Sequence, residues 1–345
     1  MRLYIEELKK MLRCRSSWLV MIAILALQVI SAISGYQDLQ YKCGNVAEYN
    51  TYAEQYNGTL ILDMVESDDI HKMQMNVYQR PDNTKEAYFY EQYLAAISRA
   101  IEYKTQYGDD DAPKYWNSVG INYLVQNLTT SVSTIFVFIG LLFGLHPIFM
   151  KDVENGMDKI IYSTYHGRKQ ILRAKCIAGI IFEIVWVTIY YFSLILFNVT
   201  LFGNIGALVV PINYIPCLYL CSWGINVWQY FLIGYLLLLI TSTFMTACIM
   251  LIYAKVKKIM VGLGAGLALI FLPMFIPKNG NWGKVFCILP SVFSNTSLIV
   301  GENLSLRFLG MEVPIVGLGC MILPLGTVFI FLLLKRIFWN GRVEL

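Results

Sequence analysis

The chain has 345 residues, of which 57% are hydrophobic and only 14% are charged, and its formal net charge is +4. Soluble domains usually carry about 25% charged residues, so this composition excludes an ordinary soluble enzyme, a disordered tail and a nucleic-acid binder. Eight cysteines are too few for a scaffold held together by disulfides. We therefore expect an all-α polytopic membrane protein.

The N-terminal segment, residues 1–15, is predicted to form an amphipathic helix. Its apolar face consists of Met1, Ile5, Leu8 and Leu12, and its basic side chains fall elsewhere. A helix with one apolar and one basic surface suits the inner interface of a membrane, where anionic lipid attracts its cations. A simple topology signal is the alternative interpretation, and both can hold.

Six apolar stretches are long enough to span a bilayer, which requires about 20 mostly apolar residues. These predicted spans are Ser17–Gly35, Val132–Met150, Ile177–Phe197, Trp228–Ala254, Ile259–Pro277 and Val313–Trp339. The first exceeds the apolar core of a typical signal peptide, so we expect it to be retained. Two shorter runs contain prolines. We interpret Gly206–Cys221 as interfacial and Val285–Phe293 as a candidate re-entrant segment.

Basic residues predict the orientation of the chain, because cytosolic loops carry an excess of Lys and Arg. With the N-terminus in the cytosol, the inner segments hold 17 of the 27 basic residues, although the outer segments are much longer. An even number of spans then places both termini in the cytosol.

The segment between the first two spans is predicted to be a small helical extracellular domain. Tyr36–Asn117 contains 14 acidic and 7 basic residues and 12 of the 23 tyrosines. Within residues 84–107, one helical stripe is formed by Tyr90, Leu94, Ile97 and Ile101. The domain either senses substrate or gates its passage, or it merely packs on the spans. The predicted divisions are residues 1–15, 16–35, 36–118 and 119–345.

The longest inner loop, residues 151–175, is predicted to hold a short amphipathic helix at the membrane surface. Its apolar positions are Met157, Ile160 and Ile161. Asp152 and Glu154 precede this helix, where its dipole favours acidic residues, and Gly167 breaks it before the basic start of the third span. Such a helix provides a rigid surface on which a cytosolic partner can push. The alternative interpretation is an ordinary connecting loop.

Together these features resemble the ABC-2-type permeases, the membrane subunits of one class of ABC exporters. The shared features are the basic N-terminal helix, six spans with both ends inside, a broken apolar segment between the last two spans, and a loose loop pattern. That pattern consists of Glu154, Gly156, Arg168 and Lys175. The large first outer loop resembles relatives in Gram-positive bacteria, some of them linked to peptide-antibiotic export or immunity.

The resemblance implies a bacterial cell-membrane protein in which two permease subunits pair and each contacts a separate ATPase subunit. ATP and Mg would bind the ATPase, and this chain would hold no cofactor. The residues that the resemblance assigns to ATPase coupling are Glu154, Gly156, Met157, Ile160, Ile161 and Arg168. The N-terminal helix would brace the same ATPase. The substrate would be an amphipathic peptide antibiotic, a lipid-like molecule or a drug.

Catalytic and metal-binding motifs are absent from the sequence. No G-x-x-x-x-G-K-[ST] loop occurs, so ATP hydrolysis requires a partner chain. The three histidines do not suggest a metal site.

Two ionisable residues, His146 and Glu183, lie inside predicted spans and are candidates for the translocation path, because such residues are costly in a membrane. They either line the inner end of a dimer cavity, bonded to each other or to water, or form a structural hydrogen bond between spans. The glycine pairs Gly140–Gly144 and Gly262–Gly266 predict close helix packing.

Two other classes of function were weighed against the permease. In an ion-coupled secondary transporter, Glu183 would be the titrating group, but such proteins often show internal repeats and several intramembrane charges. In a membrane sensor, the outer domain would bind the ligand, but an inner loop of about 25 residues is too short for an output domain. The permease is therefore the preferred interpretation.

Overall fold

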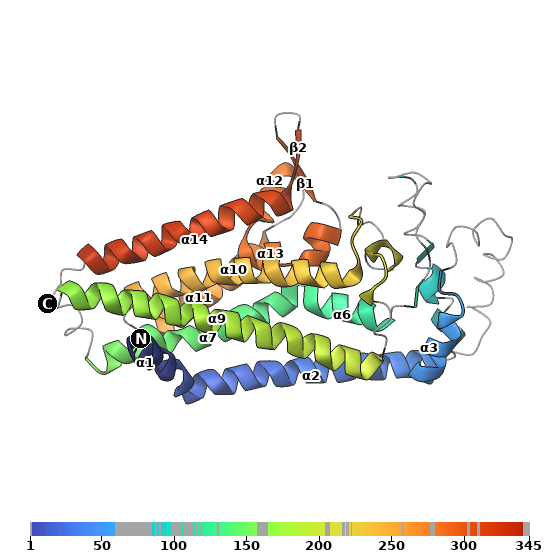
Figure 1. Ribbon diagram of the computed structural model, residues 1–345, viewed down its shortest axis with the longest axis horizontal. Coiled ribbons are helices and arrows are strands. Elements are labelled where there is room, and N and C mark those ends of the chain that lie inside the picture. The colour runs from blue at the N-terminus through green and yellow to red at the C-terminus, as the bar shows by residue number, and fades with distance from the viewer. Residues whose placement is uncertain are drawn as a thin grey trace.

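Long apolar helices dominate the computed structural model of the chain and run along its long axis (Figure 1). The structure describes residues 2–58, 85–86, 88–89, 91–94, 96–97, 105, 114, 116–117, 119–129, 131–156, 165–203, 208–215, 218, 221, 223–256, 258–276, 280–301, 304–308 and 311–340. Helix α1 (Arg2–Leu12), the end of α7 and the end of α14 lie at one end of the molecule, named here the α1 end.

Five helices in the described part of the chain are long and apolar enough to cross a membrane. They are α2 (Arg15–Cys43), α7 (Ser131–Glu154), α9 (Tyr165–Phe202), α10 (Val227–Lys255) and α14 (Ile315–Asn340). Each contains most of one predicted span, so the chain is a multi-pass membrane protein.

The remaining predicted span, Ile259–Pro277, corresponds to a shorter element. Helix α11 (Ile259–Phe271) continues only as the 3-10 turn η4 (Leu272–Phe275). Pro273 lies in η4, and proline lacks a backbone N–H and disfavours α conformation in the residue before it. The α-helix therefore ends at Phe271, nearly two turns before the predicted boundary at Pro277.

The helices flanking the inner loop are longer than predicted. α9 begins at Tyr165 and runs through Gly167, so the predicted break at Gly167 is wrong. A single glycine costs a helix only about 1 kcal/mol, and α9 recovers more by packing on α1. Asp152 and Glu154 lie in the last turn of α7, and the short helix predicted to follow them falls on residues 157–164, which lie outside the described residues.

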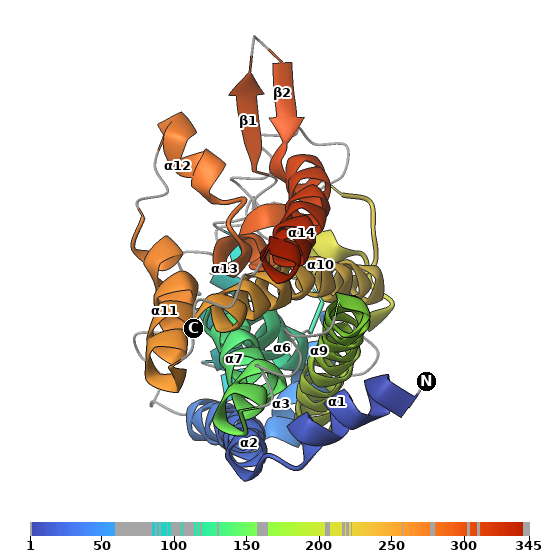
Figure 2. The same cartoon turned by 90° about the vertical axis from the view of Figure 1, so that its left-hand side faces the viewer.

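Helix α7 is the centre of the bundle. In the most apolar 18-residue stretch of α7, 72% of the residues are buried. In the corresponding stretches of α2 and α14, only 22% are buried. Viewed from the α1 end, α7 lies among α2, α9, α10 and α11, and it packs against all four (Figure 2). The first and last long helices therefore form the periphery.

Glycines allow these close contacts. A Cβ added to Gly140 would lie 2.4 Å from the Trp186 ring, and one added to Gly144 would lie 2.2 Å from Phe182, so both glycines of this pair admit rings from α9. Gly266 of the second pair likewise admits Leu142 of α7. Both motifs thus pack inside the chain.

The C-terminal end of α2 leads into α3 (Val46–Glu54) and a second hydrophobic cluster. Its buried members include Leu39, Tyr49, Phe89, Tyr93, Ile97 and Phe202. All the described residues within the predicted helix 84–107 are helical. Tyr90 and Ile101 lie outside the described residues.

Short elements fill the rest of the described chain. They are α6 (Val119–Thr129), η2 (Ile212–Tyr214), α12 (Gly280–Phe286), α13 (Pro290–Phe293), the π-helical turn η5 (Ser297–Gly301), β1 (Ser305–Phe308) and β2 (Met311–Pro314). The proline-containing run Gly206–Cys221 includes η2, and the run Val285–Phe293 includes the end of α12 and all of α13. Ile212 and α13 are buried against the main core.

The strands β1 and β2 pair antiparallel with Leu306 opposite Val313. This hairpin projects from the side of the bundle (Figures 1 and 2) and was not predicted from the sequence.

Candidate functional site

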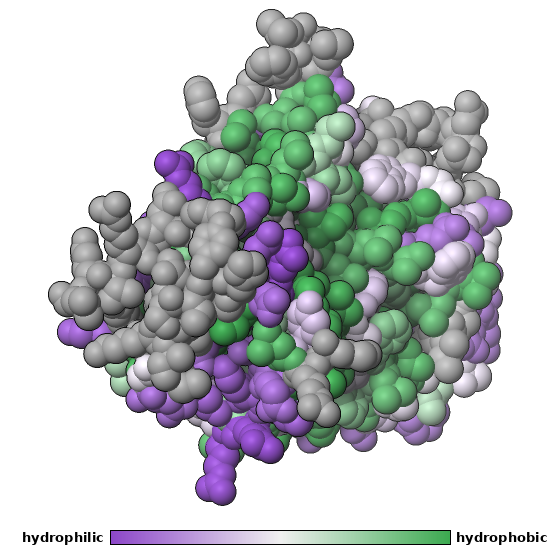
Figure 3. Space-filling view, turned by 60° about the vertical axis from the view of Figure 1, so that its left-hand side comes forward, coloured by the Kyte–Doolittle hydropathy of each residue, from purple (hydrophilic) through white to green (hydrophobic). Residues whose placement is uncertain are grey.

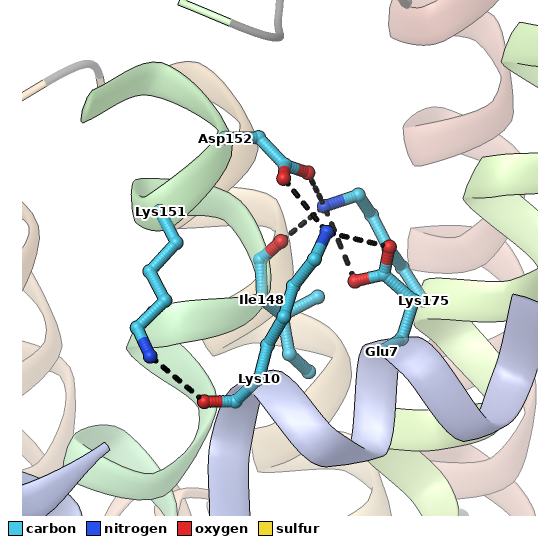
Figure 4. Close-up of polar contacts among 6 residues, drawn as sticks. All are labelled: Glu7, Lys10, Ile148, Lys151, Asp152 and Lys175. Carbon is cyan, nitrogen blue, oxygen red and sulfur yellow. Dashed lines mark hydrogen bonds and ion pairs between the residues drawn. The ribbon is translucent and has the colours of Figure 1, made fainter. Parts of the chain in front are cut away.

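Four charged side chains from three helices meet at the α1 end. They are Glu7 and Lys10 of α1, Asp152 of α7 and Lys175 of α9, and we refer to them as the α1 clamp (Figure 4). The Lys10 ammonium lies 2.8 Å from Glu7 Oε1 and 2.7 Å from Asp152 Oδ1. The Lys175 ammonium donates to Asp152 and to the Ile148 carbonyl, and lies 3.7 Å from Glu7 Oε2. The two carboxylates are therefore shared between two cations.

Three of the four clamp side chains are buried, and Lys10 is partly exposed. Lys175 is 2% exposed, Glu7 is 3% exposed and Asp152 is 6% exposed. A lone buried charge is very unfavourable, but a hydrogen-bonded pair offsets much of that cost. Lys175 gains further from the Phe149 ring, whose centroid lies 4.7 Å from its ammonium. The site therefore tolerates four charges because they balance.

Lys10, which lies outside the long apolar helices, shows how hydrogen bonds to carboxylates offset the cost of burying a charge. Burial disfavours its charge, but hydrogen bonds from its ammonium to Asp152 and Glu7 outweigh burial and raise the pKa of Lys10 above its usual value. The ammonium of Lys151 adds a hydrogen bond of 3.1 Å to the Lys10 carbonyl, which fixes the backbone of α1 on α7.

Helix α1 packs on the bundle through a face that shares only Leu8 with the predicted apolar face. Glu7 and Met11 are buried and Leu8 packs against the core, and these positions share one helical face. Of the predicted apolar face, Ile5 is 46% exposed and Leu12 is 52% exposed. One side of α1 thus binds the bundle, and an apolar side stays open.

The clamp ties α1 to both helices that flank residues 155–164. The predicted coupling residues Glu154 and Gly156 lie at the exposed end of α7. Gly156 has a φ of 66°, a left-handed conformation that favours glycine at a helix C-terminus. Arg168 lies in the first turns of α9, and its side chain is not described. Met157, Ile160 and Ile161 lie outside the described residues.

The two intramembrane candidates have separate partners. His146 Nδ1 lies 2.6 Å from the Phe143 carbonyl oxygen, and its Nε2 lies 3.9 Å from Cys14 Sγ. Glu183 accepts hydrogen bonds from the Ser242 and Thr243 hydroxyls of α10. The structure therefore does not bring His146 and Glu183 together, and Glu183 forms a hydrogen bond between two long helices.

Glu7 was not predicted as a site residue. Nor was it predicted that Lys10 and Lys175 share the carboxylates of Glu7 and Asp152. The only local signal was the Glu7–Lys10 spacing of three residues, which suits an ion pair on one helix. Their partner Asp152 lies 142 residues beyond Lys10, so no local pattern connects them. Among the described residues, no group of three or more His, Cys, Asp or Glu side chains could hold a metal ion.

Comparison with known families adds one finding. A family model described as an ABC-2 family transporter protein matches residues 1–284. That range contains all four clamp residues and residues 155–164 between α7 and α9. No match was found among curated proteins.

Proposed function

The chain belongs to the ABC-2 family of transporter proteins, whose members are membrane permeases and not ATPases, and we propose that it is the permease subunit of an ATP-driven exporter. Permeases of this family work with ABC ATPase subunits. In our proposal two permease subunits pair, each binds one ATPase, and an amphipathic substrate moves outward. A peptide antibiotic, a lipid-like molecule or a drug has the required chemistry.

The proposed topology has six spans, with α11 and η4 as the fifth. Together they cover Ile259–Phe275, which is near the lower limit of about 17 residues for a spanning helix. Both termini lie in the cytosol, and residues 36–118 form the extracellular domain. Helix α1 lies in the inner interface of a bacterial cell membrane, with the exposed Ile5 and Leu12 against lipid.

The α1 clamp is the observation that carries the coupling proposal. Residues 155–163 bind the ATPase, with Glu154, Gly156, Met157, Ile160, Ile161 and Arg168 as the contact residues. Because the clamp joins α7, α9 and α1 through buried ion pairs, a push on this segment moves three helices as one unit. α1 itself braces the same ATPase.

Purification from the host membrane in gentle detergent, followed by mass spectrometry of bound proteins, tests this proposal. We expect a stoichiometric ATPase with a P-loop, lost in Glu154→Ala/Arg168→Ala. The control Lys255→Ala/Lys258→Ala alters exposed residues at the same end of the molecule and should retain the ATPase. A cross-linked complex that contains no ATPase would contradict the exporter proposal.

Glu183 and His146 are our candidates for the inner part of the substrate path. Glu183 is fully buried, and no cation in the described part of the chain forms an ion pair with it. The same observation favours ion-coupled transport as the second candidate function, with Glu183 as the titrating group.

Glu183→Gln tests this role, because the amide still accepts hydrogen bonds from Ser242 and Thr243. Loss of transport in a stably folded Glu183→Gln protein supports a place in the path. Unchanged transport would reduce Glu183 to a structural bond between α9 and α10. Transport that needs a proton gradient and no ATPase would favour the second candidate function.

A further inference from the structure

A groove runs between α9 and α14 at the α1 end. Its volume is about 390 Å³, within the roughly 300–1,000 Å³ typical of small-molecule sites. The apolar walls include Leu172, Ile177 and Ile180 of α9 and Val328, Phe331 and Leu332 of α14. No clamp residue and no proposed ATPase-contact residue is among the described residues that line the groove.

Three cations line the same groove. Lys169 and Arg173 lie near the start of α9, and Lys335 lies near the end of α14. All three are exposed. The described lining residues include no carboxylate, and no acidic residue in the described chain pairs with any of the three. Among the described residues, the groove therefore combines an apolar interior with three cations that have no acidic partner.

The dimensions match one leaflet of a membrane. Ile180 follows Lys169 by about three helical turns, or about 16 Å at 1.5 Å per residue. Half of a hydrocarbon core is about 15 Å thick. The walls are also open on one side, because Ile177 is 42% exposed, Leu332 is 57% exposed and Val328 is 58% exposed. A chain lying in one leaflet can therefore reach the groove from the side.

The surface around the groove fits this placement. Hydrophobic residues cover much of the flank of the molecule, and hydrophilic residues gather toward the α1 end (Figure 3). The cations Lys169, Arg173 and Lys335 lie near the start of α9 and the end of α14, whereas Ile180 and Val328 lie further along the two helices. The three cations thus lie at the depth at which phospholipid headgroups sit.

We propose that the groove between α9 and α14 binds an anionic phospholipid of the inner leaflet. The phosphate lies among Lys169, Arg173 and Lys335, and an acyl chain follows the apolar walls toward Ile180. Basic pockets between spanning helices on the cytoplasmic side suit such headgroups. The proposal rests on the orientation proposed above for the chain, but it is independent of ATPase coupling.

Native mass spectrometry of the delipidated full-length protein in detergent tests the charge requirement. The probes are phosphatidylglycerol and phosphatidylcholine with identical acyl chains. We expect phosphatidylglycerol to bind at least about tenfold more tightly. Lys169→Gln/Arg173→Gln/Lys335→Gln should abolish this preference. The control Lys255→Gln/Lys258→Gln/Arg336→Gln removes the same charge from exposed residues that do not line the groove, and should retain it.

Leu332→Trp tests the apolar requirement, because the indole fills the groove and leaves the cations in place. We expect weaker binding of both lipids. Equal loss of preference in the control triple would overturn the proposal in favour of general surface charge. Full competition by inorganic phosphate at equal concentration would reassign the groove to free anions. A lipid-free dimer that the groove triple converts to monomer would reassign it to a second copy of the chain.

Discussion

Asp152 is the residue on which the α1 clamp depends, because both clamp lysines bond to it. Removing one partner from a buried ionic network leaves the others with a large desolvation cost. We predict that Asp152→Asn lowers the free energy of unfolding by about 3–5 kcal/mol, measured by thermal unfolding in detergent. Glu6→Gln is the matched control, because Glu6 pairs with Lys9 on the exposed side of α1. Equal shifts in both variants would show that the clamp adds no stability.

A double variant separates stability from coupling. Asp152→Leu/Lys175→Met replaces one buried ion pair by apolar side chains and keeps the Glu7–Lys10 pair. Such replacements are often neutral or stabilising, so we predict an unfolding free energy within about 1 kcal/mol of wild type. The ATPase bound to this variant should nevertheless hydrolyse ATP at a rate that no longer responds to the permease. Normal coupling in this variant would rule out transmission through the clamp.

At the scale of elements, glycine decides how closely α7 and α9 approach. Trp186 is fully buried and its indole N–H donates to the Val137 carbonyl at 3.1 Å, so the ring cannot move away from a new methyl group without losing that bond. We predict that Gly140→Ala destabilises the protein by about 1–3 kcal/mol. Gly264→Ala is the control, because a Cβ there meets no atom within 4 Å. Thermal unfolding of both variants decides the matter, and equal stability would contradict tight α7–α9 packing.

The existence of these helices was predictable, and their ends were not. Apolar runs of about 20 residues are a strong signal, and five of the six predicted spans match long helices. Their ends depend on tertiary contacts, as when α9 continues through Gly167 because its first turns pack on α1. The β1–β2 hairpin involves too few residues for a clear alternating pattern.

At the scale of the whole molecule, the topology makes a direct prediction. Glu54 at the end of α3 and Glu154 at the end of α7 are both exposed, and we propose that they lie on opposite sides of the membrane. Glu54→Cys should react with an impermeant maleimide in intact cells, and Glu154→Cys only after permeabilisation. Wild-type protein supplies the background from the native cysteines. Reversed reactivity would invert the orientation, and equal reactivity in intact cells would refute it.

The family could be inferred from the sequence, whereas the clamp could not. Charge asymmetry and the spacing of Glu154, Gly156 and Arg168 depend on nearby positions, which a single sequence displays. The clamp depends on Glu7 meeting Lys175 across the fold, and no local pattern encodes that contact. Glu183 illustrates the same limit, because only the fold shows that its partners are hydroxyls of α10.

The α1 clamp also sets an order of assembly during synthesis. Helix α1 leaves the ribosome before α7 and α9, yet it cannot complete its bonds to Asp152 and Lys175 until residue 175 has been made. At about 5–20 residues per second, that delay is roughly ten to thirty seconds. A chain released earlier keeps an undocked N-terminal helix with Glu7 unburied. The same four charges thus distinguish a chain that has reached Lys175 of α9 from a shorter fragment.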